Sequence, residues 1–196
     1  MVIAAQTSPC DYEALAARDL EGQWELWDGS PRAKPGMTFA HNDLGQELGH
    51  MLRNQLDRRQ YRVRSNTARV RWSDRNVFIP DVVVVPASDA VALRDQTQAL
   101  ETYVGSMPLV VEVWSRSTGD YDQEVKILTY KARGDAEIWR IHPYQRILQR
   151  WVHEPDGAYR ETIHTPGTVT LAALPGVAID LDALFASLDD WAPAAE

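Results

Sequence analysis

Two acidic side chains interrupt apolar runs that otherwise have the pattern of buried strands. Glu112 lies within the run of residues 109–113, and Asp81 lies within the run of residues 77–85. Both runs are rich in β-branched residues, which predicts strands in a sheet interior. Burying an ionised carboxylate without a partner is costly, so each acid should be paired, metal-bound or protonated.

These two acids suit a metal centre if their strands are neighbours, because adjacent strands bring such side chains within bridging distance. Two carboxylates, together with waters and a phosphate oxygen, form the hard-oxygen set that Mg²⁺ or Mn²⁺ prefers. Such an ion polarises a phosphodiester and lowers the pKa of an attacking water. The pattern therefore predicts metal-dependent phosphodiester chemistry.

Lys126 is the candidate basic residue. On a helix predicted over residues 120–133, Asp122, Lys126 and Tyr130 recur every four residues and share one face. Two interpretations stay open at this point. The lysine either forms a surface pair with Asp122, or it faces the acids, where it would orient water or stabilise developing phosphate charge.

Further helices are predicted from apolar periodicity. Leucines recur every four residues over 39–59, and Gly45 and Gly49 beside that stripe indicate a close backbone approach. Short helices are expected at 11–19 and around 181–188. In the helix of residues 120–133, which should end at Gly134, the stripe expected to face the core consists of Tyr121, Val125, Leu128 and Ala132.

Strands are predicted between these helices. Residues 24–29 should form a strand that ends in an Asp-Gly turn, followed by a loop over 30–37. The run of residues 77–85 should pair back on its neighbour as one central strand, and residues 86–106 should be a connection with helix around 97–103. The other expected strands are 61–64, 68–72, 107–115, 136–141, 146–152 and 159–164.

This order of elements predicts an α/β (α+β) fold with a central mixed sheet flanked by helices. The 196 residues suggest a single domain, and no apolar stretch reaches the roughly 20 residues that span a bilayer. One cysteine, Cys10, is consistent with a cytoplasmic protein. The sequence carries no phosphate-binding Gly-rich loop, Gly-x-Ser-x-Gly elbow or His-Glu-x-x-His pair.

The charge distribution is uneven. The net charge of −8 argues against strong nonspecific affinity for nucleic acids. Residues 53–75, however, hold eight arginines against two aspartates. This segment is either a solvated surface or a face that contacts phosphates.

These motifs together resemble the PD-(D/E)XK superfamily of restriction-endonuclease-like nucleases and, within it, the Uma-two family of endonucleases. The resemblance covers about residues 11–186. The matching segments, in order, are Glu25-Leu26-Trp27-Asp28-Gly29, the helix with His41, Pro80-Asp81-Val82, residues 108–115, Ser117-Thr118, Lys126 with Tyr130, and residues 134–143.

The resemblance implies an α/β/α core with extra C-terminal strands, spanning residues 1–196 as one domain. It implies that Asp81 and Glu112 bind Mg²⁺ or Mn²⁺, with Glu25 as a third acid. Trp114 stands where the superfamily has its lysine, and Lys126 on the following helix matches the displaced lysine. His41 and Tyr130 match accessory positions. Arg116 and His142 depart from the family pattern without touching the proposed ligands.

The function expected is hydrolysis of DNA phosphodiesters, with a homodimer as the arrangement that would cut two strands. One alternative is a catalytically silent nucleic-acid-binding or regulatory module, which the acidic net charge favours. Another is a metal-dependent hydrolase of a small phosphorylated substrate. Because one fold hosts many chemistries, the family resemblance supports the fold more strongly than the reaction.

Overall fold

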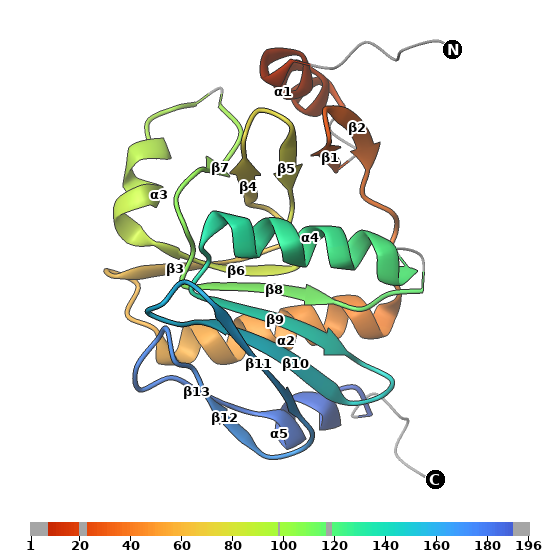
Figure 1. The fold of residues 1–196 in the computed structure, drawn as a ribbon, viewed down its shortest axis with the longest axis vertical. Helices are drawn as coiled ribbons and strands as arrows, with labels where there is room; N and C mark the ends of the chain where they lie inside the picture. The colour runs from red at the N-terminus through yellow and green to blue at the C-terminus, as the bar shows by residue number, and fades with distance from the viewer. Residues whose placement is uncertain (1–7, 20–22, 98, 117–118, 190–196) are drawn as a thin grey trace, which may run out of the picture.

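The protein is described here by a computed structural model that covers residues 8–19, 23–97, 99–116 and 119–189. Figure 1 shows a sheet with helices on both faces. Within the described residues, no helix is both long enough and apolar enough to cross a bilayer. The helices are α1 (Pro9–Arg18), α2 (Phe39–Gln55), α3 (Ala87–Leu93), α4 (Gly119–Arg133) and α5 (Leu181–Ala186).

The central sheet has the strand order β11-β10-β9-β8-β6-β3. Strands β8 and β9 run parallel and the other pairs are antiparallel, so the sheet is mixed, as predicted. A second sheet has the order β2-β1-β5-β4-β7, and β12 pairs with β13. The central strands are β3 (Tyr61–Ser65), β6 (Val82–Pro86), β8 (Leu109–Val113), β9 (Glu137–His142), β10 (Ile147–His153) and β11 (Tyr159–His164).

The remaining strands are β1 (Trp24–Trp27), β2 (Ser30–Ala33), β4 (Arg69–Trp72), β5 (Asn76–Phe78), β7 (Thr102–Tyr103), β12 (Thr168–Thr170) and β13 (Ala178–Asp180). The loop predicted over residues 30–37 is wrong in its first half, because β2 pairs back on β1. Asp28 and Gly29 both have positive φ, which a two-residue hairpin of type I′ requires. The Asp-Gly turn was therefore a hairpin signal.

The prediction of one strand over residues 77–85 is also wrong. The run divides into β5, which pairs with β1 and β4, and β6, which pairs with β3 and β8. Pro80 has no N–H to donate to a ladder, and the chain crosses from one sheet to the other at this point. Asp81 consequently lies at the junction of the two sheets rather than inside a strand.

The connection after β6 differs from the prediction as well. Its helix, α3, begins at Ala87 and ends at Leu93, whereas residues 102–103 form β7, parallel to β4. Threonine and tyrosine both favour strand, which agrees with this outcome. Tyr103 is buried in the core between the sheets and α4.

Helix α2 ends at Gln55, four residues earlier than predicted. The backbone carbonyl of Asp57 accepts from Gln60 and Tyr61, and its side chain accepts from the Arg59 amide, so a local turn replaces the helix. The close approach predicted at the glycines holds for Gly49, where an added Cβ would lie 2.7 Å from the Ser65 hydroxyl. It does not hold for Gly45, which has open space around it.

The predicted core stripe of α4 is wrong at Leu128 and Ala132, although Val125 packs against the core as predicted. Leu128 is 65% exposed and Ala132 is also exposed, while Lys126, Ile127 and Tyr130 are buried. The side chains of Tyr121 and Asp122 lie outside the described residues. The helix therefore turns its lysine-tyrosine face toward the sheet.

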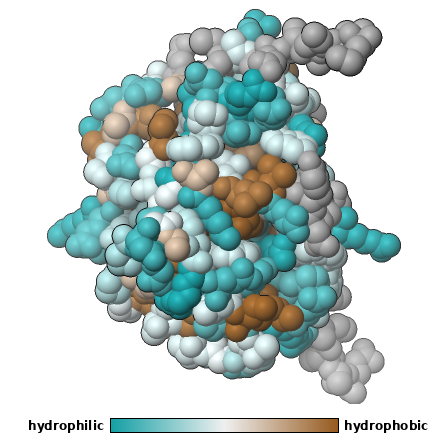
Figure 2. Space-filling view, in the orientation of Figure 1, coloured by the Kyte–Doolittle hydropathy of each residue, from teal (hydrophilic) through white to brown (hydrophobic). Residues whose placement is uncertain are grey.

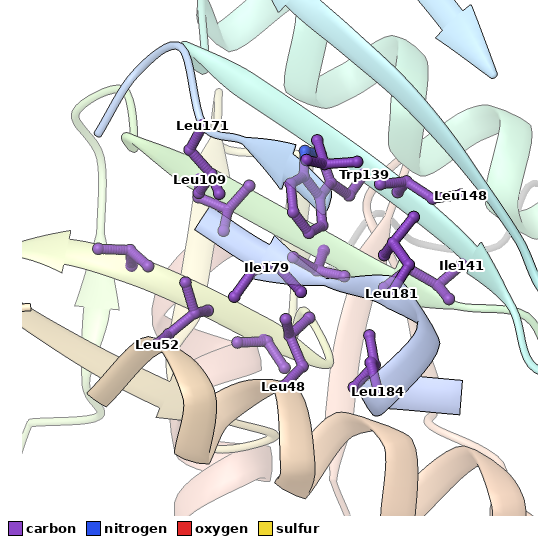
Figure 3. Close-up of a cluster of buried hydrophobic side chains, with 14 of the residues drawn as sticks. Leu48, Leu52, Leu109, Trp139, Ile141, Leu148, Leu171, Ile179, Leu181 and Leu184 are labelled. Atoms are coloured by element: carbon purple, nitrogen blue, oxygen red, sulfur yellow. The ribbon is translucent and has the colours of Figure 1, made fainter. Parts of the chain in front are cut away.

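Two apolar cores lie on the two faces of the central sheet. Figure 3 shows the larger one, in which α2, α5, β12 and β13 pack against strands β8 to β10. The second core contains residues of α4 and of the smaller sheet. On the face seen in Figure 2, hydrophobic side chains form separate patches rather than a continuous band. Strand β8 contributes Leu109, Val111 and Val113 to the first core, so alternation directs Glu112 to the α4 face.

Candidate active site

Three carboxylates and two lysines line one cavity of about 60 Å³ between the smaller sheet, β8 and α4. The carboxylates belong to Glu25, Asp81 and Glu112, and the lysines are Lys34 and Lys126. All five side chains are 11% exposed or less. The elements that carry them are distant in sequence, so only the folded chain brings these charges together.

Glu112 is held by two residues of α4. The Tyr130 hydroxyl donates to Glu112 Oε1 at 2.5 Å, and Lys126 Nζ lies 3.4 Å from the same oxygen. Burial raises the pKa of Glu112, Lys126 opposes the rise, and Asp81 adds to it, leaving a pKa of about 7. Glu112 thus exchanges its proton near neutral pH, whereas burial and Glu112 raise the pKa of the Tyr130 phenol well above its ordinary value.

Asp81 has a different environment at the junction of the sheets. Its Oδ2 accepts from the Val113 amide at 2.7 Å and lies 2.9 Å from His41 Nε2. Its Oδ1 accepts from Lys34 Nζ at 2.8 Å. Burial alone would raise the pKa of Asp81, but Lys34 and His41 outweigh it and hold the pKa well below its ordinary value. Asp81 is therefore ionised at neutral pH.

Glu25 reaches the cavity from β1. Its Oε1 accepts from the Ile79 amide and from Lys126 Nζ, both at 2.8 Å. The Ile79 amide lies in the break between β5 and β6, so this hydrogen bond replaces a ladder contact that the sheet change removes. Glu25 therefore fixes the segment that carries Asp81 as well as contacting the lysine.

Lys126 lies between two carboxylates rather than on the surface, which rejects the interpretation as a surface pair. Burial alone would lower the pKa of Lys126, but the surrounding carboxylates outweigh burial and raise it above its ordinary value. The side chain is an ammonium ion at neutral pH. It can donate hydrogen bonds and stabilise negative charge, but it has no free lone pair with which to take a proton from water.

Lys34 is the site residue that the sequence did not indicate. Its Nζ donates to the Ile79 carbonyl at 2.8 Å and to Asn66 Oδ1, in addition to Asp81. The residue lies directly after β2, in a segment predicted to be an irregular loop. A lone lysine next to Pro35 gives no periodic or motif signal, so no sequence pattern could have selected it.

His41 is buried at the first turn of α2, whose N-cap is Thr38. The Thr38 hydroxyl accepts from the His41 amide. The ring contacts Asp81 Oδ2, whereas Lys34 contacts Oδ1, and His41 Nδ1 has no hydrogen-bond partner among the described residues. His41 supports the orientation of Asp81.

The donor set fits a divalent cation in its chemistry. Three carboxylates supply hard oxygens, and a volume of about 60 Å³ exceeds what a water molecule needs. Among the described residues, no three acidic, histidine or cysteine side chains are already gathered as a ligand cage. The lysine ammonium groups instead lie against the carboxylate oxygens, so binding of an ion requires them to move aside.

The eight arginines of residues 53–75 do not surround this cavity. Three of them pair with acids: Arg64 with Glu101, Arg71 with Glu13, and Arg75 with Asp28. Arg53, Arg58, Arg62 and Arg64 line a separate cavity near the C-terminal end of α2, whereas His41 lies in the first turn of that helix. None of these eight arginines is among the described residues that line the cavity of the carboxylates.

The comparisons with known proteins agree with this architecture. A family model described as "Uma2: Putative restriction endonuclease" matches residues 9–183. A solved structure, described as a "putative nuclease belonging to DUF820 from Anabaena variabilis ATCC 29413", has 16% sequence identity and a TM-score of 0.74, over 92% of this chain and 98% of that one. No curated protein matches the sequence.

The structural likeness, at 16% identity, shows only that the two chains share a fold. The family model, in contrast, spans nearly the whole chain and includes the segments of Glu25, Asp81, Glu112 and Lys126. The matching Ser117-Thr118 segment lies outside the described residues. The chain therefore belongs to the Uma2 family, whose members are described as putative restriction endonucleases.

Proposed function

We propose that this protein is a metal-dependent endonuclease that hydrolyses phosphodiester bonds of DNA. The observation that carries the proposal is the buried Lys126 ammonium, 2.8 Å from Glu25 and 3.4 Å from Glu112, in the cavity that Asp81 also lines. A buried cation between acids has little structural advantage, because an apolar residue of similar volume is often as stabilising there.

The proposed cofactor is Mg²⁺ or Mn²⁺, held by Asp81 and Glu112 with Glu25 as a third ligand. When bound, the ion supplies Lewis-acid polarisation of the phosphate and a lowered pKa for the attacking water. Asp81 is suited to hold a cation because the pKa of its carboxyl is depressed. Glu112 has a pKa of about 7, so binding of a cation to its carboxylate would displace a proton.

Lys126 has the role of an electrostatic stabiliser in this proposal. Glu25 and Glu112 would hold the ion, and the Lys126 ammonium that now pairs with them would then be available to a phosphate oxygen. A positioned cation in a water-poor site lowers the barrier for developing negative charge. Tyr130 keeps Glu112 in place through its hydroxyl, and His41 does the same for Asp81. Cleavage of both strands would engage two copies of the chain.

A nicking assay on supercoiled plasmid with Mg²⁺ or Mn²⁺ tests the proposal. Asp81→Asn and Glu112→Gln should each abolish nicking, while Asp182→Asn, at an exposed acid of α5, should nick like the parent. Cleavage that survives in both site variants would show that another group, or a contaminant, does the chemistry.

A silent regulatory or DNA-binding module is the second candidate. The observation that favours it is the lysine pairing, which satisfies the carboxylates without any ion. Isothermal titration calorimetry separates the two functions, because only the nuclease requires Mg²⁺ or Mn²⁺ to bind. Heat of binding in the parent that disappears in Asp81→Asn supports the nuclease, and its absence in the parent supports the silent module.

A further inference from the structure

An aromatic cluster lies beside the carboxylates, at the ends of β8 and β9. The rings of Trp114 and His142 are stacked, with centroids 4.3 Å apart and planes 15° apart. Tyr144 stands nearly perpendicular to both rings and is 61% exposed. The catalytic proposal gives none of these three residues a role. Trp114 is also the position where the superfamily resemblance leads one to expect a lysine.

The position of Trp114 relative to Glu112 follows from the sheet. Trp114 continues the β8 ladder, since its amide donates to the Ile141 carbonyl at 2.8 Å. Residues two apart on a strand share a face and lie about 7 Å apart along it. Trp114 therefore emerges on the same face as Glu112, one step further toward the end of the strand.

The cluster also borders a second cavity, of about 470 Å³. Trp114 and His142 line it together with Arg140, Gln145, Gln149 and the 65% exposed Ile163. Arg140 is the register partner of Glu112 across β8 and β9, so this cavity adjoins the catalytic one on the sheet. No acidic side chain is among the described residues that line it.

The turn that holds the cluster is tied to the mouth of the catalytic cavity. The Tyr144 hydroxyl lies 3.4 Å from that of Thr38, and the preceding residue, Met37, lines the catalytic cavity. The Gln145 amide donates to His142 Nδ1, which fixes that ring. The rings thus form a positioned surface and not a set of independent exposed side chains.

We propose that this cavity binds an unpaired nucleobase of the DNA strand whose phosphodiester occupies the neighbouring carboxylate site. Aromatic side chains stack bases without regard to sequence, Arg140 can pair with an adjacent phosphate, and the side-chain amide of Gln145 can meet a base edge. The side-chain amide of Gln149 donates to Glu161 instead. A base inside a duplex has its faces covered, so the cavity selects single-stranded or locally opened DNA. This inference rests on the proposed nuclease function and adds the form of substrate.

The test is binding of a fluorescein-labelled oligo-dT to the full chain in EDTA, read by anisotropy, so that no cleavage is needed. Trp114→Ala should weaken binding by about 5- to 150-fold, the range for loss of one stacked base. Trp114→Phe should retain most of the affinity. Trp72→Ala, at a 42% exposed tryptophan of the other sheet, should bind like the parent.

Three further measurements distinguish loss of base stacking from misfolding and from loss of a phosphate contact. The dependence of affinity on salt should have the same slope in Trp114→Ala, because the lost contact carries no phosphate. An oligonucleotide with abasic sites should bind the parent weakly and lose nothing further with Trp114→Ala. Melting temperatures of the variants report whether each is folded.

Parent-like binding by folded Trp114→Ala, or equal losses in Trp72→Ala, overturns the stacking inference. Stronger binding of duplex than of oligo-dT overturns the selection for unpaired DNA. Failure of the nuclease proposal has a different signature: the parent binds oligo-dT through Trp114 but nicks no DNA with Mg²⁺ or Mn²⁺. The binding measurement therefore tests the stacking inference whether or not the protein cleaves DNA.

Discussion

Replacing Lys126 with methionine tests the ion pairs that this lysine forms with Glu25 and Glu112. The substitution keeps an unbranched side chain of similar length and removes the ammonium that lies between Glu25 and Glu112. Removing one partner of a buried ion pair costs about 3–5 kcal/mol, because the remaining charge stays buried. For a chain of this size, that corresponds to a fall in melting temperature of roughly 6–20 °C.

The loss should depend on pH in a definite direction. Glu112 already has a pKa of about 7, and loss of the neighbouring ammonium raises it further. Below that pKa the Glu112 carboxyl is protonated, so the substitution removes only the contact of the ammonium with Glu25. Above that pKa the substitution also leaves Glu112 as an unpaired buried anion. The destabilisation of Lys126→Met should therefore be larger at pH 8.5 than at pH 6.

A divalent cation should restore part of this stability, since it can take the place of the ammonium against the carboxylates. Binding at a hundred times Kd contributes about 2.7 kcal/mol. Nicking should nevertheless fall by about 100- to 1,000-fold, as expected for loss of one preorganised charge-stabilising group. Differential scanning fluorimetry with and without Mn²⁺, combined with plasmid nicking, measures both effects.

Lys131→Met, five residues further along α4, is the matched control. Lys131 lies 4.8 Å from the Trp151 ring, away from the carboxylates, so its replacement should leave nicking and the response to Mn²⁺ unchanged. If Lys126→Met unfolds at the temperature of the parent and nicks normally, the assignment of Lys126 is refuted. The same conclusion follows if Lys131→Met loses as much activity.

Three other predictions test the surroundings of the site. Tyr130→Phe removes the hydroxyl that donates to Glu112 and should reduce the rate of nicking by about 10- to 100-fold. The reason is that a hydrogen bond to a charged group contributes about 1.5–3 kcal/mol. An unchanged rate would show that Glu112 does not need this hydrogen bond. Metal affinity, measured by calorimetry, should weaken about tenfold per pH unit below pH 7, since the ion must then displace the Glu112 proton; affinity that is constant from pH 5 to 8 would contradict this. Leu48→Ala in the core of α2 should lower the free energy of unfolding by about 2–5 kcal/mol in urea without changing nicking at 20 °C; a loss of activity in the folded variant would mean that this core controls the site directly.

The sequence predicted the elements whose signal is local and repeated. The four-residue recurrence of leucines located α2, and the short β-branched run around Glu112 located β8. The apolar runs also indicated Asp81 and Glu112, and the helix face shared with Tyr130 made Lys126 a candidate; the fold brings all three to one cavity. Their proposed catalytic roles await the experiments above.

The errors have physical causes that periodicity does not record. The apolar residues of 77–85 indicate that this run is buried. They do not indicate that the chain passes from one sheet to the other at Pro80, which is what positions Asp81. In α4 the apolar pattern pointed Leu128 inward, yet the helix buries Lys126 and Tyr130 instead. The site requires charged and polar side chains in the interior, so the buried face of α4 does not follow the hydrophobic pattern. Functional sites are where predictions from local sequence patterns are expected to fail.

Convergence of the three carboxylates on one ion is the central claim, and a crystal soaked in Mn²⁺ tests it most directly through the anomalous signal of the metal. The account predicts a peak in the cavity of Glu25, Asp81 and Glu112, about 2.1 Å from carboxylate oxygens, with Lys126 moved away from Glu112. A crystal with no peak there, or with Lys126 still paired to both acids at saturating Mn²⁺, would contradict it.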